Sequence, residues 1–314
     1  MIVTVFGGSG FIGSRLIARL LDSGHTLRVF DRSFSIDRYP GVEGRLKHYP
    51  GDFSNQTDFS EIVEGSDIVF HLISTTLPSG SNNNPVADIQ GNLVPTIRLL
   101  ESMKQCGVSR LVFPSSGGTV YGEAQYLPID ERHPTQPIVS YGATKLAIEK
   151  YLAIYRNAFD FHPISLRISN PYGPGFRLGS SQGAVGAFLL KAMTKKPIDI
   201  WGTGEIRRDY IYIEDLIDAM EASMTFKGSE MVFNISTGIG TSLLELIDLI
   251  QKVTGEEMSV NHFHNRSFDV QTNILDRSLA SSQLGWQPAT SLLQGVEMTW
   301  AWLQKNSNSA LEKT

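Results

Sequence analysis

The 314-residue sequence predicts an α/β protein built on a doubly wound, parallel sheet. Short runs of β-branched and aromatic residues alternate with segments of helical periodicity through residue 169, and the first run ends in a glycine cluster. The sequence then changes to a loop rich in Pro, Gly and Ser, followed by shorter mixed elements. We therefore expect one domain over residues 1–169, to which some later segments return, and a smaller mixed α/β domain over residues 170–314.

The expected elements follow one another in a regular order. Strands of the first domain are expected at residues 1–6, 26–30, 45–49, 67–73, 110–113 and 164–168. The helices between them are expected at residues 11–21, 55–63, 86–106 and 140–157. In the second domain, we expect helices at 184–193, 214–224, 242–253 and 292–304, and strands at 210–213 and 232–235. Because strand and helix alternate, right-handed crossovers should make the first sheet parallel.

Composition and charge exclude several classes of partner. The net charge is −5 and the basic residues are scattered, so no nucleic acid partner is expected. No apolar run approaches the about 20 residues of a membrane span, so no membrane partner is expected either. Cys106 is the single cysteine, and the first residues lack the basic start of a signal peptide. We therefore expect a cytoplasmic protein.

The cluster GGSGFIG directly after the first expected strand predicts a dinucleotide-binding turn. Gly7 permits the tight turn, Gly10 lets the backbone approach a pyrophosphate, and Gly13 lets the following helix pack closely on the strand. The start of that helix then presents free N–H groups and the positive end of its dipole to the anion. We therefore expect a Rossmann-type nucleotide-binding domain first and a substrate domain after it.

An acidic residue indicates which dinucleotide binds. Asp31 ends the second expected strand, 18 residues after Gly13. A carboxylate at this place accepts hydrogen bonds from the adenosine ribose and would repel a 2′-phosphate, which favours NAD. The neighbouring Arg32 keeps NADP open as an alternative. Asp52, after the third expected strand, is either a contact to adenine or a turn residue.

A tyrosine and a lysine in SYGATK form the candidate catalytic pair. Tyr141 and Lys145 are four residues apart, so they share one face of the expected helix. An ammonium near a phenol stabilises the phenolate, and the positive nicotinamide of an oxidised cofactor would do so further. We therefore expect the pKa of Tyr141 to be lowered from about 10, which would make it a usable general base.

These motifs make the chain resemble the extended short-chain dehydrogenase/reductase superfamily, and within it the nucleotide-sugar epimerases of the UDP-galactose 4-epimerase type. The resemblance covers nearly the full length. Its matching pieces, in chain order, are GGSGFIG at 7, HL at 71, GN at 91, SSGGTVYG at 115, SYGATK at 140, LRISNPYGPG at 166, RRDYIYIEDL at 207 and LGWQP at 284.

The resemblance implies a reaction and a set of cofactor contacts. In such epimerases, NAD takes a hydride from C4 of the sugar while the tyrosine takes the O4 proton. The 4-keto sugar then turns over and receives the hydride on its other face. Tyr141 and Lys145 match the base and its helper. The remaining implied cofactor contacts are Phe11, Ile12, Phe53, Leu72 and Asn92.

The resemblance also implies residues that bind the nucleotide sugar. Asn170 and Arg208 match residues that contact the diphosphate, and Arg266 lies where a second such arginine is usual. A guanidinium is well suited to bidentate phosphate binding. Asn273 lies where the family gates the sugar pocket, and its moderate size does not bar an N-acetylhexosamine.

One segment departs from the family pattern. The catalytic Ser or Thr of the family normally stands four residues before the tyrosine of SSGGTVYG, which places Gly117 there. Ser116 and Thr119 are the nearest substitutes for the missing hydroxyl, and Ser115 is a less favoured one. Related dehydratases carry an acidic residue where this chain has Thr119, so inversion or plain hydride transfer is favoured over dehydration.

Two other functions stay open beside the epimerase. One is a nucleotide-sugar 4-keto reductase or dehydrogenase, and the other is a non-catalytic dinucleotide-binding protein.

The apolar faces of residues 86–106 and 140–157 match helices that form a dimer in the family, so a homodimer is expected, with packing inside one chain as the alternative. The HFH sequence at 262–264 lacks a third ligand, so no metal site is expected. The tryptophans at 201, 286 and 300 are expected in the core.

Overall fold

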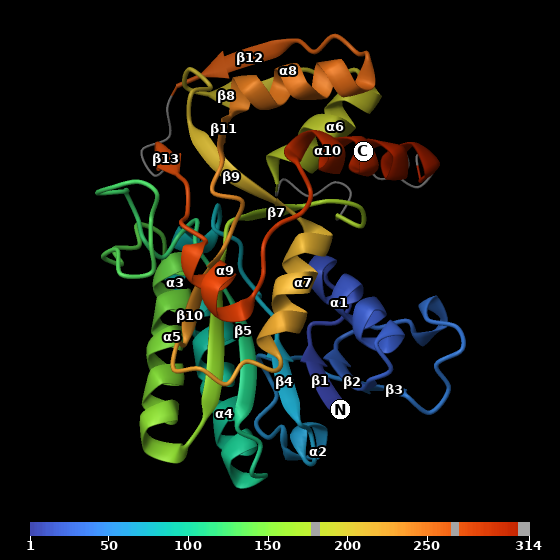
Figure 1. Ribbon diagram of the computed structural model, residues 1–314, viewed down its shortest axis with the longest axis vertical. Helices are drawn as coiled ribbons and strands as arrows, with labels where there is room; N and C mark the ends of the chain where they lie inside the picture. The colour runs from blue at the N-terminus through green and yellow to red at the C-terminus, as the bar shows by residue number, and fades with distance from the viewer. Residues whose placement is uncertain (177–182, 265–269, 307–314) are drawn as a thin grey trace.

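The computed structural model describes residues 1–176, 183–264 and 270–306. Within these residues, seven strands form one parallel sheet in the order β10-β6-β5-β4-β1-β2-β3, which confirms the predicted fold class (Figure 1). The strands are β1 (Ile2–Phe6), β2 (Thr26–Asp31), β3 (Leu46–Pro50), β4 (Ile68–His71), β5 (Arg110–Ser116), β6 (His162–Ile168) and β10 (Val232–Ile235).

Helices cover both faces of this sheet (Figure 1). On one face lie α1 (Phe11–Asp22) and α7 (Ile213–Ser223), and on the other lie α2 (Ser60–Val63), α4 (Val94–Gln105) and α5 (Ser140–Phe159). Successive side chains of a strand enter opposite core clusters: Ile68 and Phe70 join the α1 side, whereas Val69 joins the α4 side. Continuous apolar strands are therefore required, because both faces of the sheet are buried.

The long helix expected at 86–106 is divided into three segments. They are α3 (Pro85–Asp88), the π-helical segment η3 (Ile89–Leu93) and α4. Pro95 has no N–H to donate to the carbonyl of Gly91, so the regular hydrogen-bond ladder cannot pass this point. The expected helix at 55–63 is shorter than predicted, because only its last four residues, those of α2, are helical.

The later part of the chain lies over the carboxyl ends of the large sheet (Figure 1). Its strands are β7 (Asn170–Tyr172), β9 (Arg207–Tyr212), β11 (Gly240–Ser242) and β13 (Thr272–Asn273), with β8 (Ile198–Trp201) and β12 (Val260–Phe263) as a separate pair. Its helices are α6 (Ala184–Thr194), α8 (Leu243–Thr254), α9 (Ser278–Leu284) and α10 (Leu292–Lys305). Two elements of the later chain belong to the first domain: β10 pairs with β6 at the edge of the large sheet, and α7 packs on the sheet face that α1 covers.

The three tryptophans do not share one environment. Trp286 is buried and donates from Nε1 to the carbonyl of Asp215 at 2.9 Å, and Trp300 packs partly buried against the core. The prediction of a core position is wrong for Trp201, which is 38% exposed and stacks on Phe263. Along β8, Ile198 and Ile200 point inward, so the alternation of the strand turns Trp201 outward.

Among the described helices, none combines the length and apolar character that crossing a membrane requires.

Candidate active site

The glycine turn joins the carboxyl end of β1 to the start of α1. Gly7 has a φ of +92°, a conformation that favours glycine, and a Cβ there would lie 3.1 Å from the amide nitrogen of Ile73. A Cβ on Gly13 would overlap the carbonyl oxygen of Gly7, so the close approach of helix and strand requires glycine there. Gly10 is the N-cap of α1, whose first turn holds no acidic residue. The turn therefore offers open helical N–H groups to an anion.

Asp31 lies beside this turn, as predicted from its position after β2. Its carboxylate accepts hydrogen bonds from the backbone N–H groups of Ser9 at 2.9 Å and Ser33 at 3.5 Å. The Arg32 side chain is 80% exposed, and its guanidinium lies 4.0 Å from the Asp52 carboxylate. Asp52 also accepts from the amide and hydroxyl of Ser54, and this hydrogen bonding lowers the pKa of its carboxyl group. These contacts support the turn interpretation of Asp52, and its contact to adenine stays a prediction.

Two predicted cofactor contacts have side chains that point into the protein. The Phe53 side chain is buried among Phe6, Phe59 and His71. Leu72 follows β4, and its N–H donates to the carbonyl of Phe6 at 2.9 Å. Similarly, the side chains of the predicted contacts Phe11 and Ile12 pack against the core on the α1 side.

The Asn92 side chain makes several hydrogen bonds within the chain. Its Oδ1 accepts from the N–H of Thr75 at 2.8 Å, and its Nδ2 donates to the carbonyl and the carboxylate of Asp88, both at 3.0 Å. The same Nδ2 lies 3.2 Å from the Thr76 hydroxyl. Within the chain, the Asn92 side chain orders the loop after β4, and the predicted contact of Asn92 with the cofactor stays a prediction.

Lys145 lies where the sequence predicted, but it contacts a backbone carbonyl. Its Nζ donates to the carbonyl of Pro114 at 2.8 Å and lies 5.6 Å from the centroid of the Tyr141 ring. Burial lowers the pKa of Lys145 to about 8, and the charges of Glu149 and Asp88 partly oppose this shift. The pair therefore shares one face of α5, with the ammonium held at the end of β5.

The predicted lowering of the pKa of Tyr141 is wrong for the protein's own groups. Burial raises this pKa to about 12, against a hydrogen bond with Ser74 that lowers it, and the charge of Asp88 adds to the rise. The physical reason is that desolvation of the phenolate outweighs the attraction of an ammonium that is already bound to the Pro114 carbonyl. Further positive charge is therefore needed before Tyr141 ionises near neutral pH.

The segment SSGGTVYG forms a wall beside the start of α5. Ser115 and Tyr121 belong to a buried network, because Ser115 donates to Glu149 and the Tyr121 hydroxyl bonds Asn234 at 2.7 Å and Arg167 at 2.9 Å. Thr119 behaves differently: its hydroxyl is buried and has no partner among the described residues. A Cβ on Gly142 would overlap the Thr119 carbonyl, so this segment presses on the turn that carries Tyr141.

Gly117 has a packing reason for lacking a side chain. A Cβ there would stand 2.3 Å from Cδ1 of the fully buried Leu275 and 3.1 Å from the carbonyl oxygen of Arg167. The carbonyl of Gly117 accepts from Nδ2 of Asn273 at 3.0 Å, and the other amide atom, Oδ1, is buried without a partner in the described part of the chain. The space of the missing hydroxyl is therefore filled by Leu275.

Three predicted substrate residues come together on the smaller sheet. Asn170 of β7 lies opposite Tyr210 of β9, and Asn273 of β13 lies opposite Arg208. Because residues two apart along a strand share a face, Arg208 and Tyr210 point to the same side. The Asn170 amide donates to the carbonyl of Asp209 at 2.9 Å. The predicted Arg266 lies outside the described residues.

Four buried polar atoms on the segments around Tyr141 and the smaller sheet have no partner among the described residues. The hydroxyls of Tyr210 and Ser169 are buried without a partner among residues 1–176, 183–264 and 270–306, as are those polar atoms of Thr119 and Asn273. Buried polar groups in proteins are nearly always paired, so each of these four atoms is a candidate to bond a ligand. Sequence analysis missed Tyr210, and it also missed Ser74 in the polar segment after β4 and Asp88 within the expected helix at 86–106.

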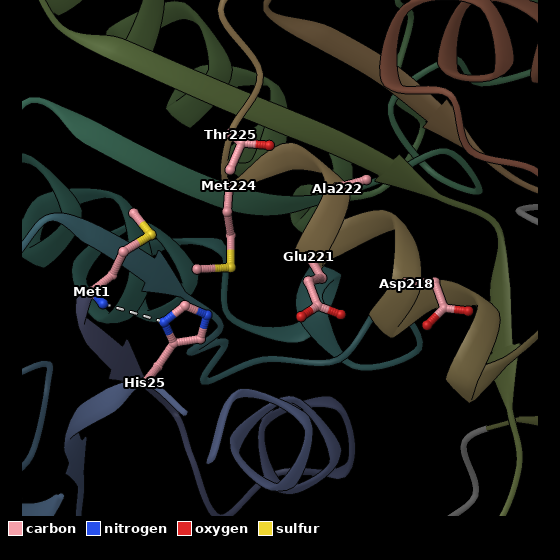
Figure 2. A pocket seen from close by; sticks show the side chains of 7 residues that line it. All are labelled: Met1, His25, Asp218, Glu221, Ala222, Met224 and Thr225. Carbon is pink, nitrogen blue, oxygen red and sulfur yellow. Dashed lines mark hydrogen bonds between the residues drawn. The ribbon is translucent and has the colours of Figure 1, made fainter. Parts of the chain in front are cut away.

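A hollow elsewhere on the surface is not connected to this site. Figure 2 shows it between the amino end of β1 and α7, with the terminal amine of Met1 3.4 Å from Nδ1 of His25. Its lining residues are Met1, His25, Asp218, Glu221, Ala222, Met224 and Thr225. The hollow lies at the opposite end of β1 from the glycine turn. The described residues contain no group of three or more potential metal ligands.

Fold and site together define a dinucleotide-dependent α/β protein with a tyrosine–lysine pair. The sequence matches the NAD dependent epimerase/dehydratase family over residues 3–236, and the chain belongs to that family. This membership confirms the predicted superfamily and NAD as the cofactor.

Relatives match over nearly their full lengths. A dTDP-4-dehydro-6-deoxyglucose reductase of Escherichia coli is 34% identical over 301 residues, which cover 94% of this chain and 95% of the relative. A putative UDP-glucose 4-epimerase of Methanocaldococcus jannaschii is 30% identical, with 98% and 100% covered. The crystal structure of a UDP-glucose 4-epimerase of Thermotoga maritima with UDP-glucose has a TM-score of 0.92 and 30% identity, and the match covers 98% of this chain and 100% of that chain.

Proposed function

We propose that this protein is an NAD-dependent nucleotide-sugar epimerase. The reaction we propose is inversion at C4 of a UDP-hexose or UDP-N-acetylhexosamine through a transient 4-keto sugar. One observation carries the proposal: Tyr141 and Lys145 lie at the carboxyl end of the sheet, which also carries the glycine turn, near buried polar atoms that have no partner in the described part of the chain. The relatives named UDP-glucose 4-epimerase support this reaction.

The chain's own residues fit NAD and supply the proton chemistry. The N-terminus of α1 has no side-chain cap, which favours pyrophosphate binding there, and Asp31 lies beside the glycine turn, where we expect the ribose. When bound, NAD supplies hydride acceptance and return together with a positively charged ring. Tyr141 accepts the O4 proton and later returns it, while Lys145 keeps positive charge near the phenol. Since burial opposes ionisation of Tyr141, the base becomes effective only in the assembled site.

We assign the orienting hydroxyl to Thr119 rather than to Ser116. The Thr119 hydroxyl is buried without a partner among the described residues, beside the turn of Tyr141. Ser116 ends β5 and is partly exposed. We further propose that Asn170 and Arg208 bind the diphosphate and that Asn273 lines the sugar pocket. The Oδ1 atom of Asn273 is buried without a hydrogen-bond donor among the described residues. Residues 1–169 would thus bind NAD, with α7 and β10 completing their sheet, and residues 170–314 would bind most of the substrate.

The test is a panel of UDP-hexoses and UDP-N-acetylhexosamines, incubated with purified protein and separated into epimers. We expect interconversion of at least one pair without net change in NADH. Tyr141→Phe should lower kcat by about 10²- to 10⁴-fold, the usual contribution of a general base. Tyr151→Phe, on the same helix but outside the site, is the matched control and should stay near wild type. Absence of interconversion for every sugar would refute the proposal.

A second candidate is a reductase of 4-keto nucleotide sugars, because one relative at 34% identity has a reductase name. Its distinguishing result is stoichiometric oxidation of NADH or NADPH, followed at 340 nm, with a 4-keto nucleotide sugar. An epimerase regenerates its cofactor and shows no such net change. Tight NAD binding with every substrate left unchanged would instead support a non-catalytic dinucleotide-binding protein.

We also propose a homodimer and a cytoplasmic location. Ile154 and Phe159 on α5 are 53% and 46% exposed, and Val86 of α3 is 62% exposed. Apolar side chains on one long helix are suited to packing against a second copy. Light scattering at several protein concentrations tests the dimer, and Ile154→Lys should convert it to a monomer. The single cysteine supports a reducing compartment.

A further inference from the structure

A buried carboxylate connects the catalytic helix to the loop after β4. Asp88 is fully buried, and it accepts hydrogen bonds from the hydroxyls of Ser140 and Thr144, each at 2.8 Å. It also accepts from the Thr76 hydroxyl and from Nδ2 of Asn92 at 3.0 Å. Four donors from three segments therefore converge on one side chain, which is the arrangement that stabilises a buried charge.

Two of these donors flank the proposed base. Ser140 precedes Tyr141, and Thr144 follows it by three residues on the same helix, so both lie within one turn of it. The N-cap Val139 offers no side-chain cap. Instead, the N–H groups of Ser140 and Tyr141 donate to Oδ1 of Asn82 at 2.8 Å and to Oγ of Ser81 at 3.0 Å. The first turn of α5 is therefore held from outside, by the segment that ends at Asp88.

The same segment reaches the ring of the base. The Ser74 side chain lies close enough to the Tyr141 phenol to lower its pKa, and the Ser74 hydroxyl donates to the carbonyl of Thr76 at 3.1 Å. Thr76 in turn bonds Asp88. A closed path of contacts thus runs from the Tyr141 phenol through the loop to Asp88 and back to α5. A displacement of Asp88 would therefore be passed along these contacts to the Tyr141 phenol. It would change the distance between the phenol and a sugar bound beside Arg208 and Tyr210 of β9.

We propose that Asp88 is a positioning residue for the proposed epimerase reaction, holding the first turn of α5 so that the Tyr141 hydroxyl meets the reacting oxygen of the sugar. The inference rests on the proposed function, since it concerns the base of that reaction. Misplacement of a reacting group by about 1 Å can lower a rate by about 100-fold. Asp88 touches neither substrate nor hydride in this role, and it acts through Ser140 and Thr144.

The charge of Asp88 gives the role a signature that packing alone lacks. The charged groups near Tyr141 are Asp88 and Lys145, and Glu149 is a further charged group near Lys145. The titratable His71 also faces Lys145, but burial lowers its pKa to about 3, so it is neutral there. A negative charge disfavours the phenolate and favours the ammonium, so Asp88 raises both pKa values. Removing that charge should therefore move both limbs of the pH–rate profile to lower pH.

The experiment compares two variants with a matched control. Asp88→Asn removes the charge but keeps a side chain that the rotating hydroxyls of Ser140 and Thr144 can bond. Ser140→Ala/Thr144→Ala keeps the charge but removes both links to α5. Glu101→Gln is the control, because Glu101 bonds Tyr155 and so ties α4 to the far part of the same helix.

The expected results separate positioning from stability. Both Asp88→Asn and the double alanine variant should lower kcat about 10- to 100-fold, with KM within about threefold of wild type. Only Asp88→Asn should shift the pH profile, and Glu101→Gln should lower the melting temperature without changing kcat. Wild-type kcat per folded molecule in both variants would overturn the inference. If Asp88→Asn does not fold, the double alanine variant decides by its kcat.

A second readout does not require turnover. Tyrosinate absorbance near 295 nm, titrated on NAD-loaded protein and corrected with Tyr141→Phe, reports the ionisation of Tyr141 itself. Asp88→Asn should ionise at lower pH than wild type, and an unchanged midpoint would contradict the inference. A wild type that leaves every sugar unchanged would refute the proposed function, whereas an active wild type with unaffected variants would refute the role of Asp88 alone.

Discussion

Replacement of Gly117 by serine tests why the family's hydroxyl is absent from this chain. The new Cβ would stand 2.3 Å from Cδ1 of Leu275, so that methyl group must move by about 1 Å or more to reach ordinary contact distance. Leu275 is fully buried and packs with Val120, Tyr121 and Ile129, which leaves little room for such a shift. Overpacking of this kind typically destabilises a protein by about 1–3 kcal/mol.

The glycine next in sequence provides the control. A Cβ on Gly118 would find its nearest neighbour, the Ser116 hydroxyl, at 4.0 Å, so Gly118→Ser should change the free energy of unfolding by less than about 0.5 kcal/mol. Neither glycine has a positive φ, so the contrast isolates steric crowding from backbone strain. Urea unfolding followed by circular dichroism, at one protein concentration and without added NAD, measures both variants.

Relief of the clash completes the test. Leu275→Val removes roughly one methylene and should destabilise by about 1 kcal/mol alone. The double variant with Gly117→Ser should lose about 1 kcal/mol less free energy of unfolding than the sum of the two single losses. The reason is that valine is smaller than leucine and makes room for the serine side chain. Strictly additive losses, or a Gly117→Ser protein as stable as Gly118→Ser, would refute the packing explanation.

The remaining predictions concern buried charge and cofactor choice. Because burial lowers the pKa of Lys145 from 10.5 to about 8, the unfolded chain binds the extra proton between these values, and stability should rise with pH there. Lys145→Met should thus stabilise the fold by about 1–3 kcal/mol at pH 7, with the gain lost by about pH 10.5 in melting experiments, while kcat falls. Glu149→Gln breaks the buried ion pair with Arg167 and should destabilise by about 3–5 kcal/mol in urea, more than replacement of both by apolar residues. Asp31→Asn should weaken NAD binding about tenfold, measured by calorimetric titration. It should also reduce the ratio of NAD affinity to NADP affinity, because the repulsive carboxylate is gone and the exposed Arg32 remains.

Local patterns predicted most of the elements and the central motifs. The start of α5 at Ser140 and of α1 at Phe11 agree with the sequence, because helical periodicity and glycine turns are properties of a few consecutive residues. The π-helical turn η3 was missed, since an apolar pattern does not reveal how Pro95 is accommodated. The exposure of Trp201 was missed for a similar reason, because the residue type alone does not show which face of its strand is buried.

The site divides in the same way. The placement of Gly7, Gly13, Asp31 and the Tyr141–Lys145 pair could be predicted from spacing, because a turn or one helix fixes the geometry of each motif. The rise in the pKa of Tyr141 could not be found, since desolvation depends on everything packed around the ring.

The sequence by itself determined the parallel sheet, the glycine turn and the tyrosine–lysine face of one helix, because each depends on neighbours within a few residues. The tertiary structure alone decided the partners that those motifs meet. Asp88 joins Ser140 across 52 positions, and Gly117 receives the amide of Asn273 from 156 positions away. Contacts of that span follow from packing of the whole chain, which no short pattern contains. They also explain SSGGTVYG: Leu275 occupies the space beside Gly117, and the Thr119 hydroxyl is buried without a partner among the described residues.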